Sequence, residues 1–353
     1  MGMFISIVIP AYNAEKFINR CMDSVYRQKT DNLEMIIVDD GSKDNTLAAV
    51  QEYIKAHDDM DIRAVSVPNG GLANARNTGY AVMKGDYFIN LDADDFLGEG
   101  IIARLQEKHN ETDFDVCFYG FQEFEEDTGR FGQHYEEQFC YLRESISGED
   151  AFLKKAGRKI WICQGSACYR TSLLERHGIR NIPGIDQGED YYLIMCLLAC
   201  SKTVACVPQN GVFISWRKES MMHASFQKSH LQVFQALDNL RKKLRSFDFL
   251  NQAALMDAYA AAEYEINRLS VAKKIAGICR ADQPGKFKRA VRAFIPPPVR
   301  LNRHLLGRKK RIESVIFYRM PGLYFYIVKT FGLFQGRKKF GMEKDISGGL
   351  PGR

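Results

Sequence analysis

The sequence predicts an α/β fold with a mostly parallel central sheet that is covered by helices on both faces. Three features of the first hundred residues indicate this fold. Strand-like segments alternate with helix-like segments, the strand-like segments are almost continuously apolar, and polar residues collect where these strands end. Near-continuous apolar strands that alternate with helices are typical of parallel sheets buried on both faces.

The expected elements follow one another in order. FISIVIP at 4–10 is the first expected strand, and a helix is expected over Ala14 to Gln28. LEMIIVDD at 33–40 is the second strand, and its helix runs from Asp44 to Ala56. The remaining elements are a strand IRAVSVP at 62–68, a helix from Leu72 to Met83, and a strand DYFINLD at 86–92.

Polar side chains follow each expected strand. In open parallel sheets, ligands bind beyond the carboxyl ends of the strands. Those ends carry Pro-Ala-Tyr-Asn at 10–13, Asp-Asp-Gly-Ser at 39–42, Pro-Asn-Gly-Gly at 68–71 and Asp-Ala-Asp-Asp at 92–95. The sequence therefore places a ligand site at this edge.

The stretch YFINLDADDFL, residues 87–97, puts three carboxylates within four positions at the end of an apolar strand. Like charges at the edge of a low-dielectric core repel one another, unless a cation or hydrogen-bond donors hold them ionised. A divalent metal is one interpretation. A solvated turn is the other, because Asp is a common turn residue.

The sequence lacks the motifs of several classes of nucleotide-binding protein. No GxGxxG follows the first strand, and no GxxxxGK[ST] occurs in the chain. A phosphatase with an aspartyl nucleophile would place its Asp pair on the first strand, whereas here the pair ends the fourth. The remaining interpretation is a Mg²⁺ or Mn²⁺ ion that is held by the carboxylates and bridges a diphosphate.

The composition is that of an ordinary globular protein. The 353 residues, 46% of them hydrophobic, allow one large domain or two. None of the nine cysteines forms a CxxC pair, which favours buried thiols over zinc sites or disulfides. Because the N-terminus has no signal-peptide pattern, we expect no secretion and a cytoplasmic location.

The C-terminal part differs in charge from the rest. Residues 284–353 carry 17 Lys and Arg against 3 Asp and Glu, whereas the other 283 residues carry 32 against 40. Basic residues are interleaved with VIFYRMPGLYFYIVKTFGLF, which is broken by charges and a Pro-Gly pair and falls short of the ~20 apolar residues of a spanning helix. We expect this tail to lie on an anionic membrane surface. Folding back onto the domain that precedes the tail and an oligomer contact are the alternatives. We expect no nucleic-acid partner, since no such motif occurs.

Four blocks carry a family resemblance. They are SIVIPAYNAEKFINRCMDSVYRQ, MIIVDDGSKDNT, NGGLANARNTGYAVMKGDYFINLDADD and SLLERHGIRNIPGIDQGEDYY. Over roughly residues 3–220, the chain resembles family 2 glycosyltransferases, the inverting enzymes with a GT-A fold that include bacterial capsular, exopolysaccharide and lipopolysaccharide enzymes. The resemblance implies a nucleotide-sugar donor, Mn²⁺ or Mg²⁺, and a glycan or lipid-linked oligosaccharide acceptor.

The resemblance also implies roles for residues of the donor site. Asp40 would accept a hydrogen bond from uracil, which favours a UDP-sugar, or would cap the following turn. Arg76 would reach the base or the diphosphate, or would be an ordinary exposed helix residue. The other implied donor-site residues are Pro10, Ala11 and Tyr12 at the base, Asp92 at the ribose and metal, Asp94 at the metal, and Asp95 at the loop or acceptor.

The same resemblance makes Asp190 the general base and Glu189 its supporting neighbour, in a triplet Gly-Glu-Asp that opens an apolar helix. Arg217 and Ser220 would meet the diphosphate from a loop, and His223 is either a metal ligand or a surface residue. The chain departs from the family before its YRTSLL block, which leaves the acceptor open. Trp161 in this region is either a sugar platform or a core residue.

These interpretations divide the chain into a catalytic domain at 1–220, a helical extension at 221–283 and the basic tail at 284–353. Two other functions stay open. A sugar-nucleotide nucleotidyltransferase would carry a Gly-rich basic loop after its first strand, where PAYNAEKF stands here. A non-catalytic scaffold that binds a nucleotide sugar would have no chemical need for three retained carboxylates at 92, 94 and 190.

Overall fold

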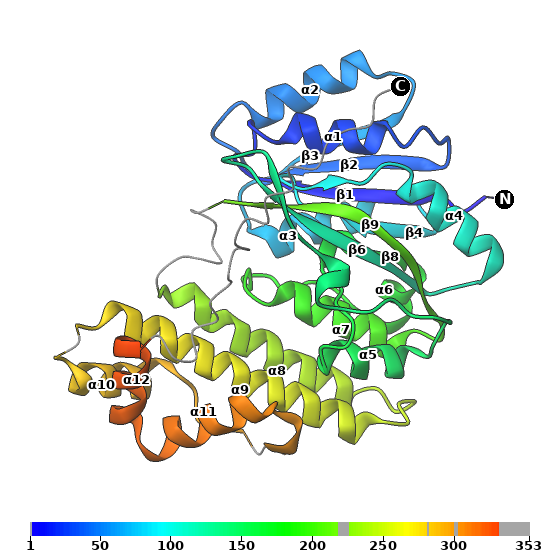
Figure 1. The fold of residues 1–353 in the computed structure, drawn as a ribbon. Coiled ribbons are helices and arrows are strands. Elements are labelled where there is room, and N and C mark those ends of the chain that lie inside the picture. The colour runs from blue at the N-terminus through cyan, green and yellow to red at the C-terminus, as the bar shows by residue number, and fades with distance from the viewer. Residues whose placement is uncertain (1, 218–225, 281, 300–302, 332–353) are drawn as a thin grey trace, which may run out of the picture.

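The structure is a computed structural model that describes residues 2–217, 226–280, 282–299 and 303–331. Figure 1 shows a twisted sheet in the upper part of the molecule and a group of helices below it. The strands are β1 (Ile5–Ala11), β2 (Leu33–Asp39), β3 (Asp61–Ser66), β4 (Tyr87–Asn90), β5 (Phe96–Leu97), β6 (Val116–Glu125), β7 (Arg130–His134), β8 (Ala167–Arg170) and β9 (Val204–Trp216).

The α-helices are α1 (Ile18–Tyr26), α2 (Thr46–Ala56), α3 (Leu72–Val82), α4 (Ile101–Glu111), α5 (Gly148–Ala156), α6 (Ser172–His177), α7 (Glu189–Cys200), α8 (Gln232–Arg245), α9 (Ala253–Ile278), α10 (Pro284–Phe294), α11 (Arg308–Arg319) and α12 (Pro321–Phe331). Short 3₁₀ helices are η1 (Tyr135–Glu137), η2 (Gln164–Ser166), η4 (Lys228–Leu231) and η5 (Arg303–Leu305).

The N-terminal half of the sheet is parallel, as predicted. β1 pairs with β2 and with β4, and β2 pairs with β3, all in parallel register. Every residue of β1, β2 and β4 is buried, which explains their continuous apolar sequences. In the edge strand β3, Ile62 is buried and the other five residues are partly or fully exposed.

The first helix begins later than predicted, at Ile18 rather than Ala14. Asn13 adopts a left-handed conformation with φ 51°. The amides of Asn13 and Ala14 donate to Ser42 Oγ at 3.0 Å and Thr46 Oγ1 at 2.7 Å. The segment after β1 is therefore fixed against the start of α2 instead of joining the helix.

The other half of the sheet contains the antiparallel pairs. The full strand order is β3-β2-β1-β4-β8-β6-β9-β5, and β7 pairs with β6. β8 is antiparallel to both β4 and β6, β5 is antiparallel to β9, and β6 pairs in parallel with β9. Ten of the twelve residues of α7 are buried, and the helix contacts both α5 and α8.

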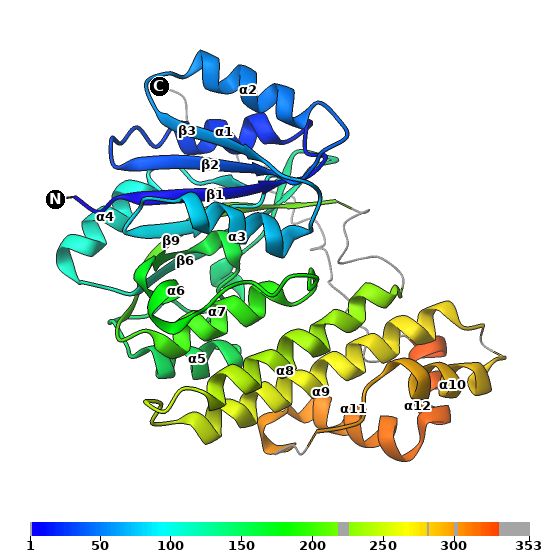
Figure 2. The same cartoon turned by 180° about the vertical axis from the view of Figure 1, so that it is seen from behind.

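The C-terminal helices form a second apolar cluster. α10, α11 and α12 each contact α9, and buried residues of all of them pack together with residues of α8. Residues 284–331 therefore fold onto the helical extension, as Figure 2 shows from the opposite side. Among the described residues, no helix combines the length and the apolar character that crossing a bilayer requires.

Candidate active site

The carboxyl ends of the parallel strands bring most of the predicted residues to one edge of the sheet. Pro10 and Ala11 are buried within β1, whereas Tyr12, the next residue, is 47% exposed. Of the three predicted base-pocket residues, Tyr12 is the one whose side chain is open to a ligand.

Asp40 follows β2 and is buried. Its two carboxylate oxygens accept hydrogen bonds from the backbone amides of Gly70 at 2.8 Å and Gly71 at 2.9 Å. It does not cap the turn before α2, where Asp44 accepts from Thr46. Asp40 therefore joins the ends of β2 and β3, and it positions the glycine loop that begins α3.

Arg76 lies on α3 and its side chain is only 1% exposed, so the alternative of an ordinary exposed arginine is wrong. Nη2 donates to Asp92 Oδ1 at 2.7 Å, and Nη1 donates to Glu189 Oε1 at 2.9 Å. Arg76 thereby connects the acidic loop after β4 to the start of α7. Two carboxylates hold the guanidinium in place.

The predicted acidic helix start is present at α7, where Gly188 adopts φ 85° just before Glu189. Burial and the neighbouring charge of Asp190 raise the pKa of Glu189 to about 7, although Arg76 opposes this rise. Asp190 is less buried than Glu189, and its Oδ1 accepts from the Tyr191 amide. The two acids thus have different environments.

The loop after β4 separates its three carboxylates. Asp94 forms an ion pair with Arg217, the residue after β9. Asp95 is buried, and its Oδ1 accepts from the Ser215 amide at 2.8 Å, so it holds the loop to β9. Burial, together with the charge of Asp92, raises the pKa of Asp94, and Arg217 opposes that rise. Burial and the other two carboxylates raise the pKa of Asp95 further.

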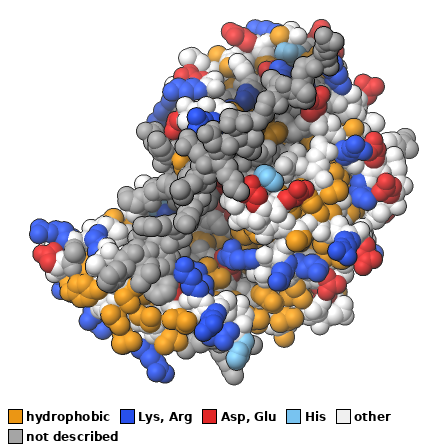
Figure 3. Space-filling view, in the orientation of Figure 1, with side chains coloured by type: hydrophobic (Ala, Val, Ile, Leu, Met, Phe, Trp, Pro, Cys, Tyr) orange, Lys and Arg blue, Asp and Glu red, His pale blue; other side chains and the backbone are white. Residues whose placement is uncertain are grey.

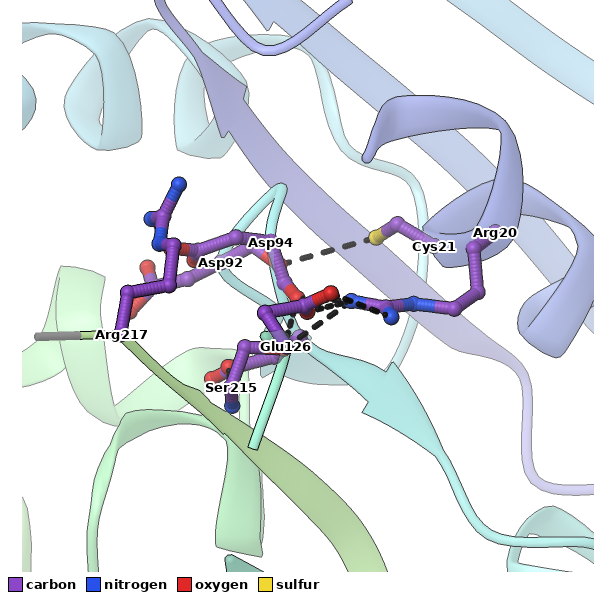
Figure 4. Close-up of polar contacts among 8 residues, drawn as sticks. Arg20, Cys21, Asp92, Asp94, Glu126, Ser215 and Arg217 are labelled. Atoms are coloured by element: carbon purple, nitrogen blue, oxygen red, sulfur yellow. Dashed lines mark hydrogen bonds and ion pairs between the residues drawn. The ribbon is translucent and has the colours of Figure 1, made fainter. Parts of the chain in front are cut away.

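Arg20 and Glu126 were not predicted from the sequence. Figure 4 shows Arg20 of α1 reaching Glu126, beside Asp94 and Ser215. Its guanidinium donates to both Glu126 oxygens, to the Asp94 carbonyl at 2.8 Å and to Ser215 Oγ at 3.0 Å. Its Cζ lies 4.6 Å from the Phe96 ring centroid. Arg20 therefore fixes the backbone of the acidic loop.

Lys155 is another residue that sequence reasoning missed. It is buried on α5, and its amine lies 4.4 Å from the Trp161 ring and 5.3 Å from the Tyr191 ring. Burial lowers the pKa of Lys155 to about 8, and the charge of Asp190 opposes that shift. Trp161 also stacks on Phe139, with ring centroids 5.7 Å apart. Trp161 is therefore at least partly a packing residue.

Two carboxylates of the loop after β4 are open to a metal ion. Within the described part of the chain, no three His, Cys, Asp or Glu side chains form a group that could hold a metal ion. Asp92 and Asp94 are nevertheless 39% and 33% exposed at their side chains. A pair of partly exposed carboxylates fits Mg²⁺ or Mn²⁺, which commonly complete their shells with substrate phosphates and water. Ser220 and His223 lie outside the described residues.

Comparisons with known proteins agree with this architecture. Residues 6–178, about half of the chain, match the family model "Glycosyl transferase family 2". The chain is 38% identical over 117 residues to the uncharacterized glycosyltransferase EpsJ of Bacillus subtilis (strain 168), covering 33% of each chain. It is 33% identical over 159 residues to the glycosyltransferase GlyG of Streptococcus pneumoniae serotype 4, covering 44% of this chain and 52% of GlyG. The chain spans about half, or less, of the length of the curated relatives it matches.

Solved structures show the same fold. S. aureus TarS 1–349 in complex with UDP-GlcNAc superposes with a TM-score of 0.69 at 17% identity, over 93% of this chain and 90% of TarS 1–349. The mannosyltransferase PcManGT of Pyrobaculum calidifontis, in complex with GDP-Man and Mn²⁺, superposes with a TM-score of 0.53 at 16% identity, over 94% of this chain and 88% of PcManGT. The expected GT-A architecture and its helical C-terminal region are thereby confirmed, and the chain belongs to glycosyl transferase family 2.

Proposed function

We propose that the protein is an inverting glycosyltransferase of surface polysaccharide synthesis. It would move a sugar from a nucleotide-sugar donor to a hydroxyl of a glycan or lipid-linked oligosaccharide. The observation that carries the proposal is the bridge from Asp92 through Arg76 to Glu189, which brings the donor-side carboxylates and the acidic start of α7 together. TarS, which shares the fold, was solved with UDP-GlcNAc, and chondroitin synthase of Escherichia coli is 44% identical over 93 residues, 26% of this chain.

We assign donor binding to the ends of β1 and β2, with a UDP-sugar favoured. Tyr12 would contact the base, and Pro10 and Ala11 would form the pocket floor. Asp40 would accept from the uracil N–H. Each of its oxygens already accepts one backbone amide, and a carboxylate oxygen has a second acceptor site.

We assign Asp94, with Asp92, to a Mn²⁺ or Mg²⁺ ion. When bound, the ion would act as a Lewis acid that stabilises the departing diphosphate. Arg217 now neutralises Asp94, and its side chain is 34% exposed. Once released from Asp94, this guanidinium would bind the diphosphate, while Arg20 would keep the loop in position through its hydrogen bond to the Asp94 carbonyl.

We assign the general base to Asp190. The acceptor hydroxyl would attack the anomeric carbon on the face opposite the diphosphate, and Asp190 would take its proton. Glu189 would act as a positioning residue, because its ion pair with Arg76 holds the start of α7 against the donor side. Asp95, tied to Ser215, would keep the loop rigid.

We also propose that the enzyme is cytoplasmic and lies at the inner face of the cell membrane, with residues 1–220 catalytic and residues 221–283 and 284–353 as the helical extension and the basic tail. The two alternatives to membrane binding, folding back onto the protein and an oligomer contact, would both place the tail against protein. The described part of the tail packs on α9 and still leaves basic and apolar side chains exposed. A homo-oligomer is compatible with this arrangement.

A panel of nucleotide sugars tests the donor assignment. A ligand that binds only the native state raises the melting temperature by mass action. We expect UDP-sugars to stabilise the protein in the presence of Mn²⁺, and chelator to remove that effect. Stabilisation by GDP-sugars alone would contradict the UDP assignment, and stabilisation by none would contradict the proposed function.

A further inference from the structure

We propose that α10, α11 and α12 form a docking face for an anionic lipid bilayer, built from the residues that packing on α9 leaves exposed. The inference rests on the proposed function in one respect: the docking face would hold the active site near a lipid-linked acceptor. The face itself follows from burial, charge and the placement of these helices.

The first step is that the helices are fixed to α9. Phe287, Phe317, Tyr324 and Phe325 are buried in the second apolar cluster. These four aromatic side chains therefore belong to the apolar core of the helical region. They are unavailable to a membrane.

Buried polar contacts fix α11 and α12 in orientation on α9. Glu313 on α11 is fully buried, with Lys273 of α9 at 2.9 Å, Lys310 at 3.1 Å and the Tyr324 hydroxyl of α12 donating at 3.1 Å. Breaking such a buried network leaves unpaired charge, so it specifies one arrangement of α11 and α12 on α9. The exposed side chains of α11 and α12 are consequently held in a fixed arrangement.

The second step is the set of apolar side chains that remain outside. Among the exposed large apolar residues of these helices and their ends are Phe294 (36%), Ile312 (50%), Met320 (47%), Leu323 (45%) and Tyr326 (47%). Figure 3 shows hydrophobic side chains gathered over the region of α10–α12, at the lower left, with Lys and Arg among them. Exposed apolar side chains that gather in one region of the surface mark an interaction site.

The third step is that the exposed charged side chains of these helices are all basic. The one acidic residue between 284 and 331 is Glu313, and it is buried. Exposed basic residues of α10 and α11 are Lys286, Lys288, Arg289, Arg292, Arg308, Lys309 and Arg319. Every exposed ionised side chain on the described part of these helices is therefore positive. An anionic lipid surface can bind both the basic and the apolar side chains. Its headgroups attract the basic residues, and the apolar side chains enter the boundary between headgroups and acyl chains.

The fourth step is orientation. α10 and α12 lie on the same side of the molecule as the carboxyl ends of the parallel strands, on the left in Figure 1 and on the right in Figure 2. A bilayer bound by this face would therefore lie near the edge of the sheet that carries Asp94 and Arg217. A lipid-linked acceptor is displayed at such a surface.

Co-sedimentation of the full chain with vesicles tests the docking face. The vesicles contain either phosphatidylcholine alone or equal parts of phosphatidylcholine and phosphatidylglycerol. We expect binding to the anionic vesicles only, weakened by salt. The triple variant Ile312→Ser, Leu323→Ser, Tyr326→Ser and the triple variant Lys286→Gln, Arg289→Gln, Arg292→Gln should each weaken binding by about ten-fold or more.

Matched variants use residues of similar exposure elsewhere. Phe249→Ser with Leu255→Ser changes residues that are 47% and 42% exposed outside this face, and Lys55→Gln with Lys242→Gln and Lys202→Gln removes three exposed charges. These variants should bind vesicles as the wild type does. All variants should keep the wild-type melting temperature, because exposed substitutions change stability little.

Equal binding to both kinds of vesicle, or equal losses in the matched variants, would overturn the proposal. Absence of vesicle binding would overturn it as well, and salt-sensitive self-association lost in the two face variants would then assign the face to a second copy of the chain. Thermal stabilisation by nucleotide sugars is measured on the same samples without lipid. Donor binding without vesicle binding sinks this inference alone, whereas vesicle binding without donor binding sinks the proposed function alone.

Discussion

Arg217, the residue after β9, forms an ion pair with Asp94 of the loop after β4. The pair lies at the carboxyl edge of the sheet, and Arg217 Cζ is also 4.4 Å from the Phe17 ring. A protein cation thus occupies the carboxylate that we assign to the metal. On this assignment, binding of the metal and donor would break the ion pair: Asp94 would bind the metal and Arg217 the diphosphate. The pair would therefore belong to the unliganded state of the site.

The first prediction concerns Asp94 itself. Asp94→Asn should lower turnover by at least about 100-fold, since a Lewis-acid metal contributes several kcal/mol of transition-state stabilisation. The melting temperature without ligands should change little, because the side chain is 33% exposed. Initial rates with Mn²⁺, with Mg²⁺ and with excess chelator check this. Full wild-type activity in excess chelator would refute metal dependence.

The second prediction concerns Arg217 as a competitor of the metal. Arg217→Ala should tighten Mn²⁺ binding in the absence of donor by up to about five-fold, the range of a partly exposed ion pair. Turnover should fall, because the diphosphate loses a cation. Electron paramagnetic resonance of free Mn²⁺ measures the affinity. Arg217→Lys keeps the charge and should stay close to the wild type in Mn²⁺ affinity; a similar affinity in all three proteins would contradict the competition.

The parallel half of the fold could be predicted because its strands are buried on both faces and alternate with helices. The antiparallel half could not. β5 has two residues and β8 has four, which is too short for a periodic signal. β6 and β9 pair in parallel from Val116 and Val204 to Glu125 and Trp216, and local sequence does not encode pairing between strands so far apart along the chain.

The candidate site shows the same division. Its carboxylates were predicted from motifs, but their connections were not. The burial of Arg76 depends on Asp92 and Glu189, which lie 16 and 113 positions away along the chain. Arg20 meets Glu126 across 106 positions. In the C-terminal region, composition could not tell the buried Tyr324 from the exposed Tyr326 before the packing partner of the helix was known.

The third prediction concerns the seating of α3, the helix that carries Arg76. A Cβ on Gly79 would lie 2.3 Å from Val8 Cγ1 in the buried face of β1. Gly79→Ala should therefore destabilise the fold by roughly 1–3 kcal/mol, as overpacking does. Gly277→Ala in α9 is the matched control, since no atom lies within 4 Å of its added Cβ. Urea unfolding of both variants checks this, and equal midpoints would contradict it.

The fourth prediction concerns the general base. Asp190→Asn should lower turnover by at least ~10²-fold, the usual loss for general-base catalysis. Donor affinity, measured by thermal shift, should stay near the wild-type value, because Asp190 makes none of the contacts that hold the donor side. Glu189→Gln should lower turnover less and also weaken donor binding through Arg76. If Glu189→Gln proved the more damaging change to turnover, the roles of the two acids would be reversed.

The last prediction uses the pKa of Glu189, which burial and the charge of Asp190 raise from its ordinary 4.5 to about 7. Between these values the unfolded chain has released the proton and the folded protein still holds it. The resulting stability is fully present below about pH 4.5 and is lost as the pH rises through 7, a difference on the order of 3 kcal/mol. Glu189→Gln cannot titrate, and Asp94, Asp95 and Asp190 remain in both proteins. The free energy of unfolding of the metal-free wild type, relative to that of Glu189→Gln, should therefore decrease as the pH rises from 4.5 to 8. Urea denaturation at matched ionic strength measures it. A constant difference across this range would show that Arg76 keeps Glu189 ionised throughout.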